Sequence, residues 1–111
     1  MKLNINYQLK NLNGSLILDQ GEPVTLKTVV VSGLIQPSDE SPSEKQKKFM
    51  LAQKIYNAQA PIDISLDEAK QLIDCLPKHI SPIVVGQCVS VIEGNEPVFP
   101  SDFQEVPVGQ E

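Results

Sequence analysis

Three serines in the second half of the chain stand where a helix is expected to begin. Ser41 and Ser65 each open a Ser-x-x-Glu pattern that ends at Glu44 and Glu68. In such a capping box the serine oxygen accepts a hydrogen bond from the third helical amide, and the glutamate returns to the serine amide. Ser81 is followed by proline, which suits the first helical position because that amide has no intrahelical partner. These signals predict a largely helical second half.

Three helices follow from these starts and from the spacing of apolar residues. Residues 42–58, 66–76 and 82–93 repeat apolar side chains every three to four positions, as amphipathic helices do. The inward stripe expected for the first helix is Phe49, Ala52, Ile55 and Tyr56, with Leu51 nearby. The stripe expected for the second is Leu66, Ala69, Leu72, Ile73 and Leu76.

The last of these helices is apolar on almost every side, so it is either central to the core or half of an interface. In the second case Val85, Val89 and Ile92 are the candidate interaction surface, and the helix would mediate self-association into a homo-oligomer. Gly86 in its interior costs about 1 kcal/mol against alanine, which favours close helix packing at that point. Gly94 is the expected C-terminal cap.

The first part of the chain has the pattern of strands. Apolar and polar residues alternate over residues 3–9, which is the period of a strand with one buried face. Asn13-Gly14 is a strong tight-turn signal because both residues tolerate positive φ, and residues 15–18 are expected to return as a second strand. Another turn is expected over 19–23. A two-stranded hairpin is marginal alone, so it must pack on the helices or on a partner.

Residues 25–35 carry two conflicting signals. Their apolar residues fall on one helical face, and Thr25 is placed to cap a helix. The β-branched run 29–31 is instead typical of a strand. The helical pattern is the better fit, and the strand remains the alternative.

These patterns predict an α+β fold in which an N-terminal β-hairpin packs on a small bundle of three to four helices. A chain of 111 residues fits one compact domain, which we place at residues 1–94. Residues 95–111 contain proline and scattered acids without periodicity, so we expect a flexible, mobile acidic tail. Docking of Val98, Phe99 and Phe103 on the body is the alternative.

The charge balance opposes direct binding to nucleic acid. The chain has a net charge of −5, and its nine positive residues are all lysines. The guanidinium fork that recognises phosphate or carboxylate by two parallel hydrogen bonds is therefore absent. The one basic cluster, Lys45, Lys47 and Lys48, is expected to be the solvated face of a helix.

No segment has the pattern of a membrane span or a signal peptide. The longest apolar runs, 29–31 and 83–85, fall far short of a membrane span, and no basic region with a long apolar run opens the chain. Cys75 and Cys88 lie in apolar helical context without metal-ligand spacing. We expect free thiols and a cytoplasmic protein, with a disulfide between neighbouring helices as the alternative.

No constellation of residues predicts catalysis. His79 is the only histidine, and the chain contains neither a GxSxG nucleophile turn nor a glycine-rich phosphate loop. Asp67 and Asp74 are spaced to share a helix face, but capping and solvation explain such carboxylates without a site. We therefore expect no catalytic residues, no cofactor and no metal.

Four stretches in order resemble a group of short proteins encoded in tailed bacteriophages and bacterial prophages. They are Tyr7–Ser15, Pro23–Leu26, Ile64–Glu68 and Ser81–Gln87, and the resemblance covers about residues 5–93. Its most specific parts are the hairpin with Asn13-Gly14 and the stretch Pro82–Gln87. It implies a non-enzymatic accessory protein, active in the bacterial host, that binds a protein partner. That partner is a phage structural protein if the role is virion tail assembly. It is a host enzyme or defence complex if the role is inhibition or regulation.

Overall fold

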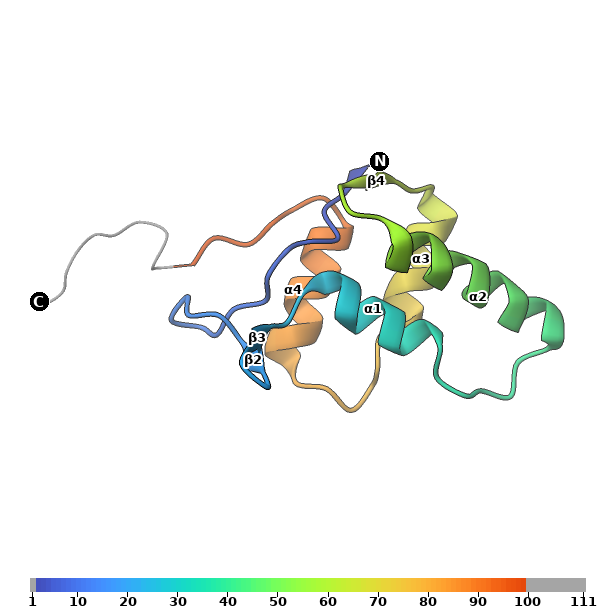
Figure 1. The fold of residues 1–111 in the computed structure, drawn as a ribbon, viewed down its shortest axis with the longest axis horizontal. Helices are drawn as coiled ribbons and strands as arrows, with labels where there is room; N and C mark the ends of the chain where they lie inside the picture. The colour runs from blue at the N-terminus through green and yellow to red at the C-terminus, as the bar shows by residue number, and fades with distance from the viewer. Residues whose placement is uncertain (1, 100–111) are drawn as a thin grey trace, which may run out of the picture.

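The computed structural model describes residues 2–99, which form four helices and two very short antiparallel sheets (Figure 1). The helices are α1 (Leu26–Leu34), α2 (Pro42–Asn57), α3 (Leu66–Cys75) and α4 (Pro82–Ile92). The strands are β1 (Lys2–Leu3), β2 (Leu18–Asp19), β3 (Glu22–Pro23) and β4 (Ile62–Asp63). The predicted α+β class is confirmed.

The N-terminal segment keeps the expected alternation but not the expected ladder. Leu3, Ile5, Tyr7 and Leu9 are buried, as the period of two predicts. The regular strand pairing involves other residues. β1 pairs with the distant β4, and the tight hairpin is formed by β2 and β3, with its turn at Gln20 and Gly21 and not at Asn13-Gly14. The Asn13-Gly14 turn is present, with a single bridge between Lys10 and Leu16 beside it.

The reason for this difference is that the chain entering α1 competes for the same backbone groups. The Leu26 amide donates to the Tyr7 carbonyl at 2.9 Å, and the Lys27 amide donates to the Ile5 carbonyl at 3.0 Å. The amide of Leu9 in turn donates to the Val24 carbonyl at 2.9 Å. Residues 5–9 are therefore held by the entry to α1, which a local hairpin pattern cannot reveal.

The capping signals hold to different degrees. Ser65 and Glu68 form the complete capping box, in which the Glu68 amide donates to Ser65 Oγ and the Ser65 amide donates to Glu68 Oε1. Ser41 accepts from the Glu44 amide but receives no reciprocal bond. Ser81 makes no side-chain cap, and α4 begins with proline alone. The conflict over residues 25–35 resolves as helix α1, whose N-cap is Thr25.

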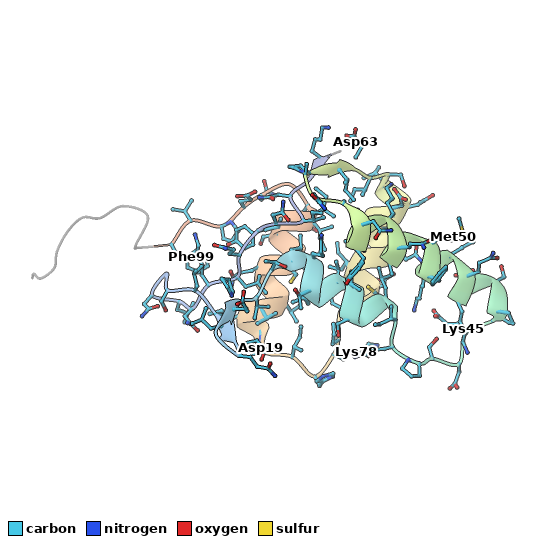
Figure 2. All side chains as sticks on the ribbon, in the orientation of Figure 1. Asp19, Lys45, Met50, Asp63, Lys78 and Phe99 are labelled. Carbon is cyan, nitrogen blue, oxygen red and sulfur yellow. The ribbon has the colours of Figure 1, made fainter. Side chains whose placement is uncertain are left out.

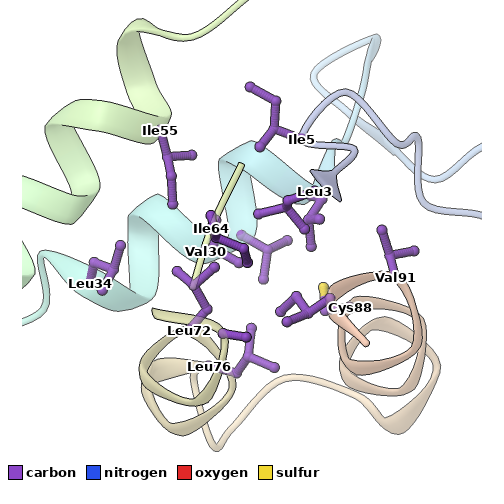
Figure 3. Packing of buried hydrophobic residues seen from close by; sticks show 14 of the residues in the cluster. Leu3, Ile5, Val30, Leu34, Ile55, Ile64, Leu72, Leu76, Cys88 and Val91 are labelled. Atoms are coloured by element: carbon purple, nitrogen blue, oxygen red, sulfur yellow. The ribbon is translucent and has the colours of Figure 1, made fainter. Parts of the chain in front are cut away.

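The hydrophobic core lies between α1, α3 and α4, with the N-terminal segment inserted beside it (Figure 3). Figure 3 shows Leu3 and Ile5 from this segment and Cys88 and Val91 from α4 converging on the same cluster. The helix that the sequence left as core or interface thus contributes directly to the core.

A buried glutamine joins α4 to the N-terminal segment. Gln87 is 5% exposed, and its side-chain amide donates to the carbonyls of Lys10 and Ile83, both at 2.7 Å. Its oxygen accepts from the Lys10 amide at 2.9 Å and from the Tyr7 hydroxyl at 3.3 Å. A buried amide with every group paired avoids the desolvation penalty of an unpaired one and fixes the position of the segment.

Three expectations about helix faces are wrong. Phe49 and Tyr56, expected inside, are 59% and 67% exposed, and Leu66 is 74% exposed. Gly86, expected at a close helix contact, faces open space, whereas Gly33 of α1 is the glycine at a close crossing, against the backbone of Cys75. The first half of α2, residues 42–50, has no buried residue, because it extends beyond the helices that would cover it (Figure 1).

The described part of the chain includes the beginning of the segment expected as a tail. Phe99 is buried, and the Lys10 ammonium lies 5.7 Å from the centre of its ring. Glu96 accepts a hydrogen bond from the side-chain amide of Asn4 at 2.9 Å. The remaining residues of that expected tail, 100–111, lie outside the described residues.

Candidate functional site

The surface expected on α4 is divided between core and solvent. Ile92 is fully buried, so it belongs to the core and not to an exposed surface. Val85 and Val89 are half-buried and pack against the core cluster. The exposed positions on this helix are Pro82 and Gly86, and the exposed Glu93 follows it as the C-cap. α4 therefore offers few large apolar side chains to a partner.

A larger apolar surface lies between α1 and α2. Ile35, Phe49 and Tyr56 are 64%, 59% and 67% exposed. Ile35 and Phe49 line a hollow of about 270 Å³ at one end, and Ile35 and Tyr56 line a second of about 300 Å³. Ile35 lines both hollows, so they adjoin one another, and we call the two together the α1–α2 groove.

The groove has firm walls. Beside the groove, α2 is anchored in the core by Leu51, Ala52 and Ile55, which are buried. At the other end the Lys27 ammonium of α1 donates to the carbonyls of Tyr56 at 3.2 Å and Ala58 at 2.6 Å. A lysine that satisfies the free carbonyls at a helix C-terminus fixes the two helices to one another.

The electrostatics of the groove differ from those of the remaining chain. Lys45 and Lys48 line the first hollow, Lys27 lines the second, and no carboxylate lines either one. Residues 26–57 hold five lysines and three acids, a net charge of +2 in a chain whose total is −5. The rest of the chain therefore carries −7. Figure 2 shows Lys45 at the extended end of α2, with Met50 further along the helix.

One ion pair borders the groove. The Lys48 ammonium lies 2.6 Å from a carboxylate oxygen of Glu40 in the loop before α2. The hydrogen bond from Lys48, with a second from Ser38, holds the pKa of Glu40 below its usual value. The Lys45 ammonium has no carboxylate within ion-pair distance among residues 2–99.

The carboxylates considered for chemistry do not assemble a metal site. Asp67 and Asp74 share a face of α3, as their spacing predicts, and line a hollow that also contains Lys47 and Lys70. Within the described part of the chain, no group of three His, Cys, Asp or Glu side chains could hold a metal ion. His79 is exposed in the loop between α3 and α4.

Both cysteines are free thiols, as expected. Burial raises the pKa of the Cys75 thiol to about 11 and that of Cys88 to about 12. Both are therefore protonated at neutral pH, and a protonated thiol is a poor nucleophile. Cys75 Sγ also lies 3.1 Å from the Leu72 carbonyl, as a weak donor within its own helix.

Sequence reasoning assigned the groove residues to the wrong side of α2. Leu51 and Ile55 define one stripe, whereas Phe49 and Tyr56, seven residues apart, define another about a third of a turn away. Two stripes on an otherwise polar helix are the signal that could have revealed this face. Treating the two stripes as a single stripe predicted one broad buried face. The helix instead has a narrow buried face and, beside it, an exposed apolar face.

Comparisons of this chain with protein-family models, with curated proteins and with solved structures find no match. None of the helices within residues 2–99 has both the length and the apolar character needed to cross a membrane.

Proposed function

We propose that this chain is a non-enzymatic accessory protein of a phage or prophage. It acts in the cytoplasm of the bacterial host, where it binds another protein during virion tail assembly. The observation that carries the binding role is the α1–α2 groove with its three exposed apolar residues, Ile35, Phe49 and Tyr56. The phage context comes from the resemblance over residues 5–93. Clustered apolar side chains left exposed beside a hollow are typical of a partner-binding surface.

The chemistry of the groove supports a protein partner. Aromatic side chains near the centre of a patch are the commonest anchors of protein interfaces, and Phe49 and Tyr56 both lie along this groove. Both stand on a helix whose end is fixed by Lys27, so little conformational freedom is lost on binding. The groove thus combines exposed anchors with a preorganised backbone.

The test is affinity capture with the tagged full chain from phage-infected host lysate, followed by mass spectrometry. We expect a phage tail protein to be recovered by the native chain and lost with Phe49→Ser. Leu18→Ser is the matched control, because Leu18 is equally exposed, at 58%, but lies on β2 away from the groove. Its capture should be unchanged.

Each other outcome has a defined meaning. Recovery of a host enzyme or defence complex would replace assembly with inhibition as the role. Recovery of this chain alone would replace both with self-association. A tail protein captured equally by the native chain and by Phe49→Ser would show that the α1–α2 groove is not the binding surface.

A further inference from the structure

Resting on the proposed function, we infer that the α1–α2 groove receives a single amphipathic helix of the partner, with an apolar stripe flanked by carboxylates. The groove lies between α2 on one side and α1 with the loop that follows it on the other, and its lining includes Ile35, Phe49 and Tyr56. A groove with apolar side chains along a helix is a form that can receive an amphipathic helix. Three features of the molecule support this occupant: the spacing of the groove residues, the charge around them, and the unburied half of α2.

The spacing of the groove matches a helix. Phe49 and Tyr56 are seven residues apart on α2, which corresponds to about 10.5 Å along the axis at about 1.5 Å per residue. Ile35 lines both hollows, Phe49 lines the first, and Tyr56 lines the second. A partner helix lying along α2 would place side chains at i and i+7 over the same length, with those at i+3 or i+4 against Ile35.

The charge around the groove selects an acidic partner. Lys45 and Lys48 line the first hollow, and no carboxylate lines it. Lys48 is paired with Glu40 at 2.6 Å, whereas Lys45 has no carboxylate within ion-pair distance among residues 2–99. A carboxylate on the border of an approaching helix would therefore meet the Lys45 ammonium. Complementary charge of this kind accelerates association and fixes the orientation of the bound element.

The same charges argue against a second copy of this chain on the same surface. In a two-fold dimer each subunit presents the same patch, so the groove lysines of one copy would approach those of the other. Nucleic acid is disfavoured for other reasons: the chain contains no arginine, its net charge is −5, and large apolar side chains line the groove.

The first half of α2 provides room for the partner. Residues 42–50 have no buried residue, and Phe49 and Met50, both more than half exposed, lie at its inner end. A helix bound in the groove would rest against this extended half as well as against α1. It would thereby cover apolar surface that the described chain leaves in solvent.

The experiment is a selection of 16-residue peptides from a random library displayed on yeast, with the full chain as the target. We expect the enriched peptides to carry net negative charge and apolar residues at i, i+3 or i+4, and i+7. Purified peptides should become helical on binding, as measured by circular dichroism. Their affinity should fall as salt is raised, because exposed charge pairs are screened.

Two variants and two controls test the site itself. Phe49→Ser should weaken an enriched peptide by about tenfold or more, as expected for an interface anchor, while Leu18→Ser should not. Lys45→Glu should weaken the same peptide severalfold. Lys78→Glu makes the same change in net charge at an exposed loop position and should have no effect. All four positions are exposed, so each variant is expected to fold, which circular dichroism checks.

The inference fails if the enriched peptides are basic or extended, if no peptide is enriched, or if Lys45→Glu and Lys78→Glu have equal effects. These failures are distinct from failure of the proposed function. If Phe49→Ser abolishes capture of a tail protein while the library yields no acidic helix, the binding role stands and the acidic helical partner is wrong. If capture is unaffected but acidic helical peptides bind, the helix-binding groove stands and the proposed role is wrong.

Discussion

Helices α2 and α4 invert the roles that their compositions suggest. α4 is the more apolar helix, yet most of its large side chains pack in the core, and Cys88 and Ile92 are completely inaccessible to solvent. α2 is polar overall, yet it exposes Phe49, Met50 and Tyr56. A helix that is apolar all round is one that the fold surrounds. A few large apolar residues on a polar helix are the better indication of a binding surface when, as here, nothing within residues 2–99 covers them.

The largest expected effect is on the free energy of unfolding, when a charge is placed at a buried apolar position of α4 and at an exposed apolar position of α2. Ile92→Glu places a charge in the core, and we expect it to unfold the chain, with a loss of more than about 4 kcal/mol. Phe49→Glu should change the free energy of unfolding by less than about 1 kcal/mol, because Phe49 is already in solvent. Urea denaturation followed by circular dichroism measures both. Similar losses in the two variants would contradict the contrast between α4 and α2.

The next effect concerns the amide that joins α4 to the N-terminal segment. Gln87→Ala leaves the Lys10 amide and carbonyl without their side-chain partner, and we expect a loss of about 2–3 kcal/mol. Gln53→Ala on the exposed side of α2 is the matched control, with a change of less than about 0.5 kcal/mol. Thermal unfolding of both variants distinguishes a structural role of Gln87 from a general effect of losing a glutamine.

Two glycines should respond to alanine in opposite directions. A Cβ at Gly33 would collide with the Cys75 carbonyl at the crossing of α1 and α3, so Gly33→Ala should destabilise by about 1–3 kcal/mol. A Cβ at Gly86 would meet nothing within 4 Å, so Gly86→Ala should stabilise by up to about 1 kcal/mol.

The Gly86 variant also separates the two candidate surfaces. Gly86 lies on the outward side of α4, so alanine there should leave capture of the partner unchanged if the α1–α2 groove is the binding surface. Loss of capture in a stabilised Gly86→Ala variant would instead return the binding role to α4.

Local features of the fold could be predicted from the sequence, and features that depend on distant parts of the chain could not. The Ser65–Glu68 capping box and the alternation over residues 3–9 each depend on neighbours within a few positions, and both are present. The pairing of β1 with β4 joins Lys2 to Asp63, and no local pattern encodes such a partner.

The candidate site was missed for a related reason. Helical periodicity identifies which residues share a face, but not which face the rest of the chain covers. The stripe of Phe49 and Tyr56 and the stripe of Leu51 and Ile55 are both apolar, and only the position of α1 decides between them. The groove therefore depends on tertiary packing, although each of its residues is visible in the sequence.

The smallest effect concerns the capping box that opens α3 and the ion pair that ties it to α2. The Ser65 amide, and to a lesser extent Lys54 of α2 at 3.3 Å, hold the pKa of the Glu68 carboxyl below its usual value of 4.5. Because the folded-state pKa is the lower one, this contribution to stability is present above pH 4.5 and is lost as the pH falls through the folded-state value. Glu68→Gln should therefore reduce the loss of stability on acidification, measured by urea denaturation at a series of pH values.

Ser65→Ala should cost about 1 kcal/mol at neutral pH. Glu44→Gln is the control, because it removes a carboxylate from the same position of a helix where the side chain returns no bond to the N-cap amide. An equal reduction in Glu44→Gln and Glu68→Gln would mean that the capping box contributes nothing beyond a surface charge.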